Sequence, residues 1–117
     1  MKNTFLVLAG LAFSVTLAAA QAPSVTGTLI DNMCFKPSMG QAELAKHTRE
    51  CALMDGCVKA GYAVVTADGH VYKLDAAGNE KAVAALKAST KAADLKVTVT
   101  GPNEGGTIKV ASITLAK

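Results

Sequence analysis

The alternation of apolar and polar positions predicts a chain that is rich in β-structure after a uniformly apolar start. Residues 5–17 are mostly apolar, and residues 25–31 then alternate enough to predict a first strand. The clearest half-buried strand is predicted further on, because Leu95, Val97 and Val99 lie on one face and polar residues separate them. These patterns predict a small domain built around strands.

A hairpin and an irregular last strand are predicted in the remaining β-rich runs. Residues 62–66 and 70–74 flank an Asp-Gly turn, which is a strong hairpin signal. In the last run, apolar side chains move from even positions such as Ile108 to odd positions such as Ile113. An inward face can be kept there only if one extra residue is accommodated. The sequence therefore predicts a β-bulge near residues 111–112.

Two helices are predicted between the strands. A capping-box pattern precedes residues 41–54, which are rich in helix formers. His47 and Cys51 would lie on one face of this helix, because they are four residues apart. A second helix is predicted over residues 79–89, with its apolar stripe toward the core.

The predicted order is strand, helical insertion, strand, strand, helix, strand, strand. Five strands with a helix between the third and fourth is the element order of the OB-fold, a small Greek-key barrel. We therefore expect a mainly β (α+β) fold, a five-stranded OB-like barrel with a helical insertion after strand 1, at about residues 34–61. Residues 23–117 would form this single domain. The insertion would lie in one of the loops through which OB-folds bind ligands.

The N-terminal residues have the features of an export signal. Lys2 precedes the apolar run, and small residues at 18–22 match a signal-peptidase site, with cleavage expected after Ala20 or Ala22. The run is shorter than the roughly 20 apolar residues that a membrane span needs. We therefore expect residues 1–22 to be a signal peptide and the protein to be periplasmic or secreted, with no membrane span after cleavage.

Composition argues against two classes of function. The formal net charge is +3, and no run of basic residues is present. Phe35, Tyr62 and Tyr72 are the only aromatic residues after the leader, which is too few for a base-stacking platform. We therefore expect no nucleic-acid partner. The acidic residues show no paired spacing that singles out a general acid and base, so no enzyme is expected.

Soft ligand atoms are concentrated in the predicted insertion. Every cysteine, and every methionine after the initiator, lies within residues 33–57. Three thiolates and one imidazole form a known zinc set, and sulfur also favours Cu(I). Zinc or Cu(I) is therefore one predicted ligand. The expected metal ligands are Cys34, His47, Cys51 and Cys57, with Met33, Met39 and Met54 as auxiliary donors.

The same cysteines support other interpretations. In an oxidising compartment a disulfide could join two of Cys34, Cys51 and Cys57, with Cys34 paired to Cys51 or Cys57, and would stabilise the fold by roughly 2 to 4 kcal/mol. A spare thiol near His47 could instead exchange with a neighbouring disulfide, as in a thiol-disulfide redox protein. A third class is a disulfide-stapled barrel that binds a peptide, glycan or envelope component.

The sequence also resembles a group of small exported bacterial OB-like proteins of unassigned function. The resemblance covers essentially residues 23–117, and it implies the fold, the export and the importance of the Cys and His series without implying a mechanism. Together these observations predict a small, exported, non-enzymatic binding module. The motifs that carry the resemblance are Gly27-x-Leu29-Ile30-Asp31 with Cys34, His47-x-x-x-Cys51-Ala52, Cys57 before Gly61-Tyr62, Val97-Thr98-Val99-Thr100-Gly101, and Ile108-x-Val110-x-Ser112-Ile113.

Overall fold

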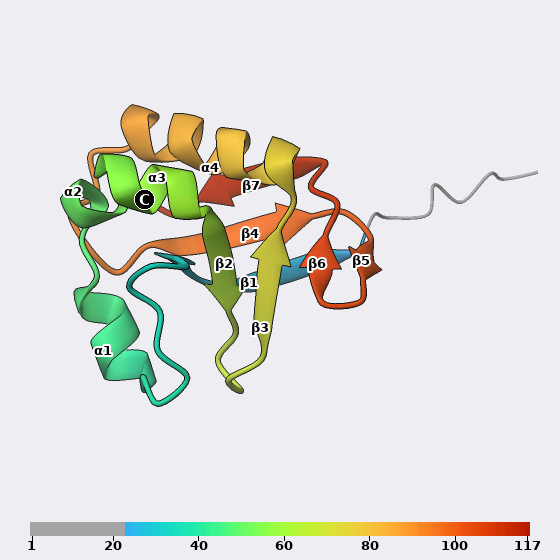
Figure 1. Ribbon diagram of the computed structural model, residues 1–117, viewed down its shortest axis with the longest axis horizontal. Helices are drawn as coiled ribbons and strands as arrows, with labels where there is room; N and C mark the ends of the chain where they lie inside the picture. Colours follow the sequence, from blue (N-terminus) through green and yellow to red (C-terminus); the bar gives the residue numbers. More distant parts are fainter. Residues whose placement is uncertain (1–22) are drawn as a thin grey trace, which may run out of the picture.

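The computed structural model describes residues 23–117, so the expected signal peptide and its cleavage sites lie outside the described residues. These residues form one seven-stranded mixed sheet with four short helices (Figure 1). The strands are β1 (Ser24–Asp31), β2 (Tyr62–Val65), β3 (Val71–Leu74), β4 (Lys96–Thr100), β5 (Asn103–Glu104), β6 (Thr107–Ile108) and β7 (Ser112–Leu115). The helices are α1 (Gln41–Lys46), α2 (Arg49–Ala52), α3 (Asp55–Ala60) and α4 (Ala76–Ala88).

The strand order is β5-β6-β3-β2-β1-β4-β7, with β1 at the centre of the longest antiparallel ladders. The predicted hairpin is confirmed, since β2 and β3 pair antiparallel around the Asp-Gly turn. Among the strands of residues 23–117, only β3 and β6 pair in parallel. On β1, Leu29 and Ile30 point to opposite faces and belong to different apolar clusters. Asp31 therefore points to the same face as Leu29.

The prediction of a five-stranded barrel is wrong, although a mainly β fold is right. The sheet has seven strands and is not closed, because β5 pairs only with β6 and β7 only with β4. The predicted bulge near residues 111–112 is instead a break between β6 and β7. Residues 109–111 leave strand geometry there, with the Ala111 amide donating to the Thr100 carbonyl oxygen at 2.8 Å. The shift of apolar side chains from even to odd positions occurs across this break.

The predicted helix over residues 41–54 is also wrong, because this stretch divides into α1 and α2 and ends at Met54, the N-cap of α3. His47 and Thr48 separate α1 from α2 and both have extended backbone, with ψ of 126° and 152°. Thr48 caps α2 through a side-chain bond from the Cys51 amide and forms an isolated β-bridge with Ala93. The expected capping box fails as well, since the N-cap of α1 is Gly40.

The main core lies between the sheet and α4. Ala82 and Leu86 of α4 are fully buried, as the predicted stripe requires, and pack in one cluster with Tyr62 of β2. A smaller cluster on the opposite face of β1 joins Ile30 to Leu44 of α1. Each face of the central strand is thus covered by a helix.

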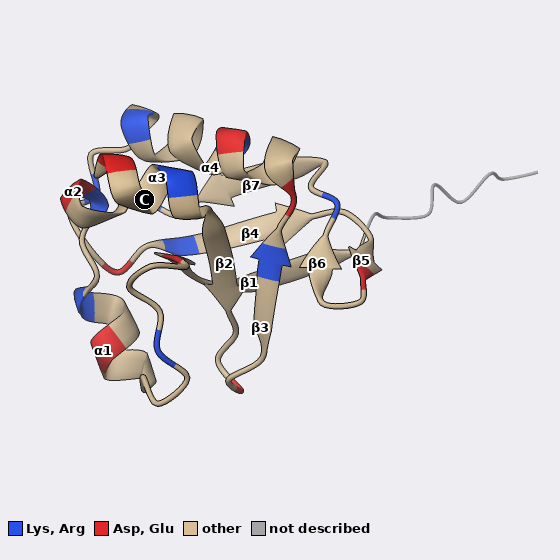
Figure 2. Cartoon of the chain, in the orientation of Figure 1, with Lys and Arg blue, Asp and Glu red and all other residues tan. Residues whose placement is uncertain are grey.

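Charge is distributed evenly over the molecule. Figure 2 shows lysine, arginine and acidic residues interspersed on the helices, on β3 and β4, and on the loops. Among residues 23–117, no helix is long and apolar enough to cross a membrane.

Candidate functional site

A buried carboxylate is the centre of the candidate site. The Asp31 side chain, at the end of β1, is 0% exposed. Its Oδ2 accepts a hydrogen bond of 2.8 Å from the Cys34 amide, which fixes the turn after the strand. Its Oδ1 lies 2.8 Å from Nε2 of His47. Burying a carboxylate costs several kcal/mol unless it is well compensated, so these two contacts offset part of that cost.

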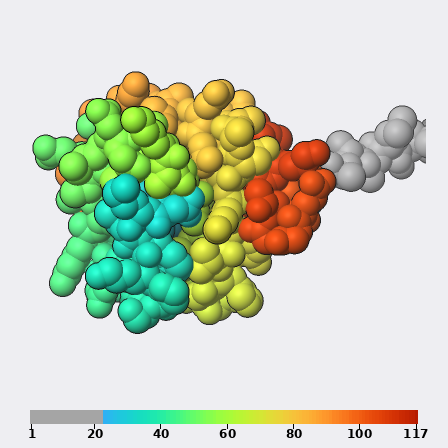
Figure 3. Space-filling model, in the orientation of Figure 1, coloured from blue at the N-terminus to red at the C-terminus, as the bar shows by residue number. Residues whose placement is uncertain are grey.

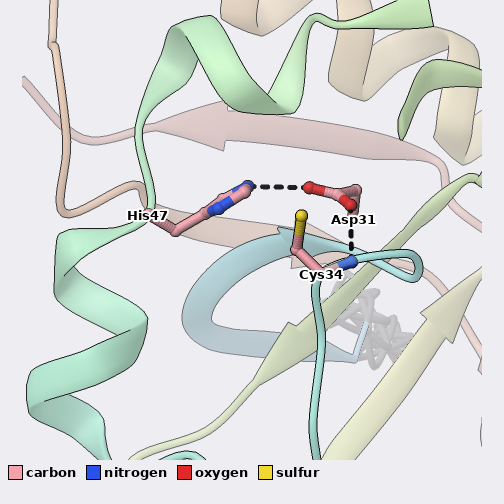
Figure 4. Close-up of side chains that lie close together, drawn as sticks. All are labelled: Asp31, Cys34 and His47. Atoms are coloured by element: carbon pink, nitrogen blue, oxygen red, sulfur yellow. Dashed lines mark hydrogen bonds and ion pairs between the residues drawn. The ribbon is translucent and has the colours of Figure 1, made fainter. Parts of the chain in front are cut away.

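His47 reaches the carboxylate from the break between α1 and α2. Its side chain is only 7% exposed, and Figure 4 shows the imidazole aimed at Asp31. The flanking backbone is anchored on both sides, since the His47 amide donates to Leu44 at 3.2 Å and the Arg49 amide to Ala92 at 2.8 Å. Within residues 23–117, His47 Nε2 and Asp31 Oδ1 have no hydrogen-bond partner, and the 2.8 Å contact between them is the polar contact that each makes. Each polar atom thus depends on the other.

Cys34 adds a sulfur donor to this pair. One carboxylate oxygen of Asp31, one ring nitrogen of His47 and the sulfur of Cys34 all lie within 4.8 Å of one another. Figure 4 shows the thiol beside the line between the carboxylate and the imidazole. In Figure 3 the segment that carries Cys34, coloured cyan, lies on the surface directly against the green helices α2 and α3. Three different donor types therefore converge from three parts of the chain.

Cys57 of α3 faces the same group. It is 4% exposed, and both Asp31 and Cys34 contribute to raising the pKa of its thiol, although it does not belong to the group of three donors within 4.8 Å of one another. The end of α3 is fastened to the end of β1, since the Asn32 amide and side chain donate to Gly61 and Ala60, each at 2.9 Å. We call Asp31, Cys34, His47 and Cys57 the Asp31 cluster.

The environment of the cluster keeps its thiols protonated. Burial raises the pKa of Cys57 to about 12, and hydrogen bonding to Asp31 and its charge contribute further. Burial is also the main reason that the pKa of Cys34 is raised, followed by the same two effects of Asp31. Burial raises the pKa of Tyr62 to about 12, with added repulsion from Asp31 and Cys57. A catalytic thiol needs the opposite shift.

The predicted ligand Cys51 lies apart from the Asp31 cluster. It is exposed on α2, and its charge contributes only weakly to raising the pKa of Cys34. All three cysteines are free thiols in the structure. Among the expected auxiliary donors, Met33 and Met54 are 64% and 60% exposed, and the Met39 sulfur accepts a bond of 3.3 Å from the Lys36 amide. The methionines are thus directed to solvent or to the backbone.

Asp31 is a site residue that the pattern of cysteine and histidine did not indicate. Its only signal was a carboxylate at the end of an apolar strand, three residues before a cysteine. Nor does the cluster lie in a large cavity. A cavity of about 540 Å³ lies between the end of α4 and β7, and none of its lining residues belongs to the Asp31 cluster.

The chain matches no protein-family model, no curated protein and no solved structure.

Proposed function

We propose that the protein is a small, non-enzymatic zinc-binding module and that the Asp31 cluster is its metal site. The observation that supports this most is the convergence of three donors, from Asp31, Cys34 and His47, within 4.8 Å of one another. Zinc takes four ligands from carboxylate, imidazole and thiolate groups. We propose that the buried thiol of Cys57, whose pKa is raised by Asp31 and Cys34, supplies the fourth ligand.

The donor types favour zinc over Cu(I). A carboxylate is a hard ligand that suits Cu(I) poorly, and Asp31 is the residue to which the other three are adjacent. The thioethers that would favour copper lie outside the cluster, with Met33 and Met54 largely exposed. Zinc also satisfies the two atoms that otherwise have only each other, Oδ1 of Asp31 and Nε2 of His47.

Binding requires modest movement and the loss of protons. With zinc-ligand distances of about 2.0 to 2.3 Å, tetrahedral ligand atoms lie about 3.3 to 3.8 Å apart, so the cluster must tighten around the ion while the 2.8 Å Asp31–His47 contact opens. The thiols of Cys34 and Cys57 must ionise, which their raised pKa values oppose in the absence of a cation. The divalent charge offsets the negative charge that Asp31 and two thiolates would concentrate in a buried site.

A zinc titration of the purified, reduced protein against a chromogenic chelator tests this function. We expect one zinc per chain. His47→Ala should weaken binding by at least about 10- to 100-fold, a loss typical even of groups that only orient a ligand. His70→Ala is the matched control, because His70 is an exposed turn residue paired with Asp68 and should leave affinity unchanged. Equal affinities for the two variants, or no binding by the parent protein, would refute the proposal.

The expected export signal indicates the compartment in which zinc would be bound. We propose that zinc is bound in the periplasm or outside the cell, after removal of residues 1–22. Cell fractionation with an epitope at the C-terminus tests this, because a cytoplasmic chain that keeps its leader would contradict it.

A further inference from the structure

A groove runs between α4 and the open edge of β7. Among the strands of residues 23–117, β7 is the last of the sheet and pairs only with β4. The cavity of about 540 Å³ beside it is continued by a second one of about 340 Å³, and the two share Ala85 and Ile113. We call this the β7 groove, and the residues that define it are Lys81, Ala85, Ala88, Lys91, Ile113 and Leu115.

The backbone of β7 presents hydrogen-bonding groups along this groove. The Ala116 amide donates to the Lys96 carbonyl oxygen at 2.8 Å, so the two residues face each other as a hydrogen-bonded pair. Every second residue of an antiparallel ladder bonds to its partner strand, so the N–H and C=O groups of Ile113 and Leu115 point away from β4. In the described part of the chain, neither residue makes a backbone hydrogen bond outside the ladder.

The two edges of the sheet differ in how they are protected. At the opposite edge, β5 has two residues, both exposed, and one of them is Glu104. β7 has four residues and carries neither a charge nor a proline, while Ile113 and Leu115 pack against the main core. Proteins usually block an open edge with charges, proline or a very short strand. β7 lacks these features and is therefore suited to pairing with a further strand.

We propose that the β7 groove binds an extended, acidic peptide segment of a partner protein, which adds to the sheet as a strand beside β7. The peptide backbone bonds to the outward groups of Ile113 and Leu115, and every second peptide side chain enters the groove. This activity goes beyond zinc binding and is independent of it, since no residue of the Asp31 cluster lines either cavity.

The charge of the groove indicates the character of the peptide. Among the described residues, the charged side chains that line the two cavities are all lysines, namely Lys81, Lys91 and Lys117. Lys81 lines only the smaller cavity and Lys91 only the larger, so acidic residues on both sides of an apolar centre complement the groove. Two copies of this chain joined through β7 would instead bring their lysines together, which disfavours a second copy as the occupant.

Fluorescence anisotropy with a labelled, capped peptide of sequence Glu-Glu-Val-Thr-Val-Thr-Val-Glu-Glu tests the proposal. We expect saturable binding at submillimolar concentrations. A peptide with lysine in place of every glutamate should bind at least about tenfold more weakly at low salt. The double variant Lys81→Glu with Lys91→Glu should lose at least about fivefold in affinity for the acidic peptide. Lys73→Glu is the matched control, because this exposed lysine of β3 lines neither cavity.

Backbone methylation of the peptide tests strand addition without altering the protein. In antiparallel addition, the valines would bond to Ile113 and Leu115, so N-methylation of the valines should abolish binding and N-methylation of the threonines should not. Parallel addition reverses the two results. Loss of binding with one set alone therefore supports the proposal, and equal binding of both methylated peptides and the parent peptide would overturn it.

Three other results would also overturn the proposal. They are the absence of saturation at millimolar peptide, equal binding of the acidic and lysine peptides, and equal binding by the double variant and Lys73→Glu. Sedimentation analysis covers the remaining occupant, because a dimer that does not take up the peptide would assign the groove to a second copy of the chain.

Discussion

Removal of the His47 imidazole is expected to destabilise the fold even when no metal is present. The His47→Ala change leaves the Asp31 carboxylate, which is 0% exposed, without the group that faces it at 2.8 Å. A buried polar group that loses its partner keeps the full cost of its desolvation. Removing one partner of a buried pair costs about 3 to 5 kcal/mol, because the remaining charge stays buried.

Urea denaturation followed by circular dichroism, at pH 7 with reductant and a metal chelator, measures this loss. We expect His47→Ala to lower the free energy of unfolding by about 3 to 5 kcal/mol, a large share of the roughly 5 to 15 kcal/mol typical of small domains. His70→Ala, whose partner Asp68 is 65% exposed, should change it by less than about 1 kcal/mol.

A second variant separates lost packing from lost charge compensation. In the double variant Asp31→Asn with His47→Ala, no carboxylate remains to be compensated, while the amide oxygen can still accept the Cys34 amide hydrogen bond. We expect this double variant to be more stable than His47→Ala alone. A loss below about 1 kcal/mol in His47→Ala, or a double variant that is less stable still, would refute the reasoning.

Three further predictions concern protons and packing. Without metal, the free energy of unfolding should fall as pH rises from about 9 toward 12, because the pKa of Cys57 is raised from 9.0 to about 12 and the native state keeps a proton that the unfolded chain has lost. In pH-dependent denaturation the share of Cys57 is up to about 4 kcal/mol, and Cys57→Ala should remove this share while Cys34 and Tyr62, whose pKa values are also raised, still contribute. Zinc affinity should rise between pH 6 and 8, because about two protons are released for each zinc ion bound. Calorimetry in buffers of different ionisation enthalpy measures this release, and binding that does not depend on pH would contradict ligation by thiolates. Gly27→Ala should lower the free energy of unfolding by about 1 to 3 kcal/mol, measured by thermal denaturation, because the added Cβ would collide with the Val65 carbonyl group. Gly40→Ala should be nearly neutral, because a Cβ added there meets no atom within 4 Å.

Local periodicity was sufficient to place most of the regular elements. The predicted strands at residues 25–31 and 62–66 correspond to β1 and β2, and the predicted helix at 79–89 overlaps α4. These elements follow from the spacing of apolar residues along a few turns or pleats, which is information that the sequence carries locally.

The errors occur where distant segments determine the backbone. The predicted helix over residues 41–54 breaks because Thr48 bridges to Ala93, and the Arg49 side chain donates to the carbonyl oxygens of Leu86 and Lys87 at 2.5 and 3.2 Å. No pattern within the helix itself reports these contacts. Whether the sheet closes into a barrel likewise depends on pairing between remote strands, which the order of elements does not determine.

The candidate site was predicted in part. The clustering of cysteine and histidine in one segment directed attention to Cys34 and His47, which the fold brings together with Asp31, and to Cys57, whose buried thiol has its pKa raised by Asp31 and Cys34. Cys51 was included because it would share a helix face with His47, and that argument failed when the helix proved to be broken. Asp31 was missed, since its burial depends on tertiary packing around the end of β1.

X-ray absorption spectroscopy at the zinc edge of the zinc-loaded, reduced protein tests the central claim most directly. The account predicts two sulfur ligands at about 2.3 Å and two nitrogen or oxygen ligands at about 2.0 to 2.2 Å, with one sulfur lost in Cys57→Ser and none in Cys51→Ser. A shell of three sulfur atoms would mean that Cys51 is a ligand, and a shell of oxygen alone would mean that zinc binds elsewhere. Either result would contradict the assignment of zinc to the Asp31 cluster.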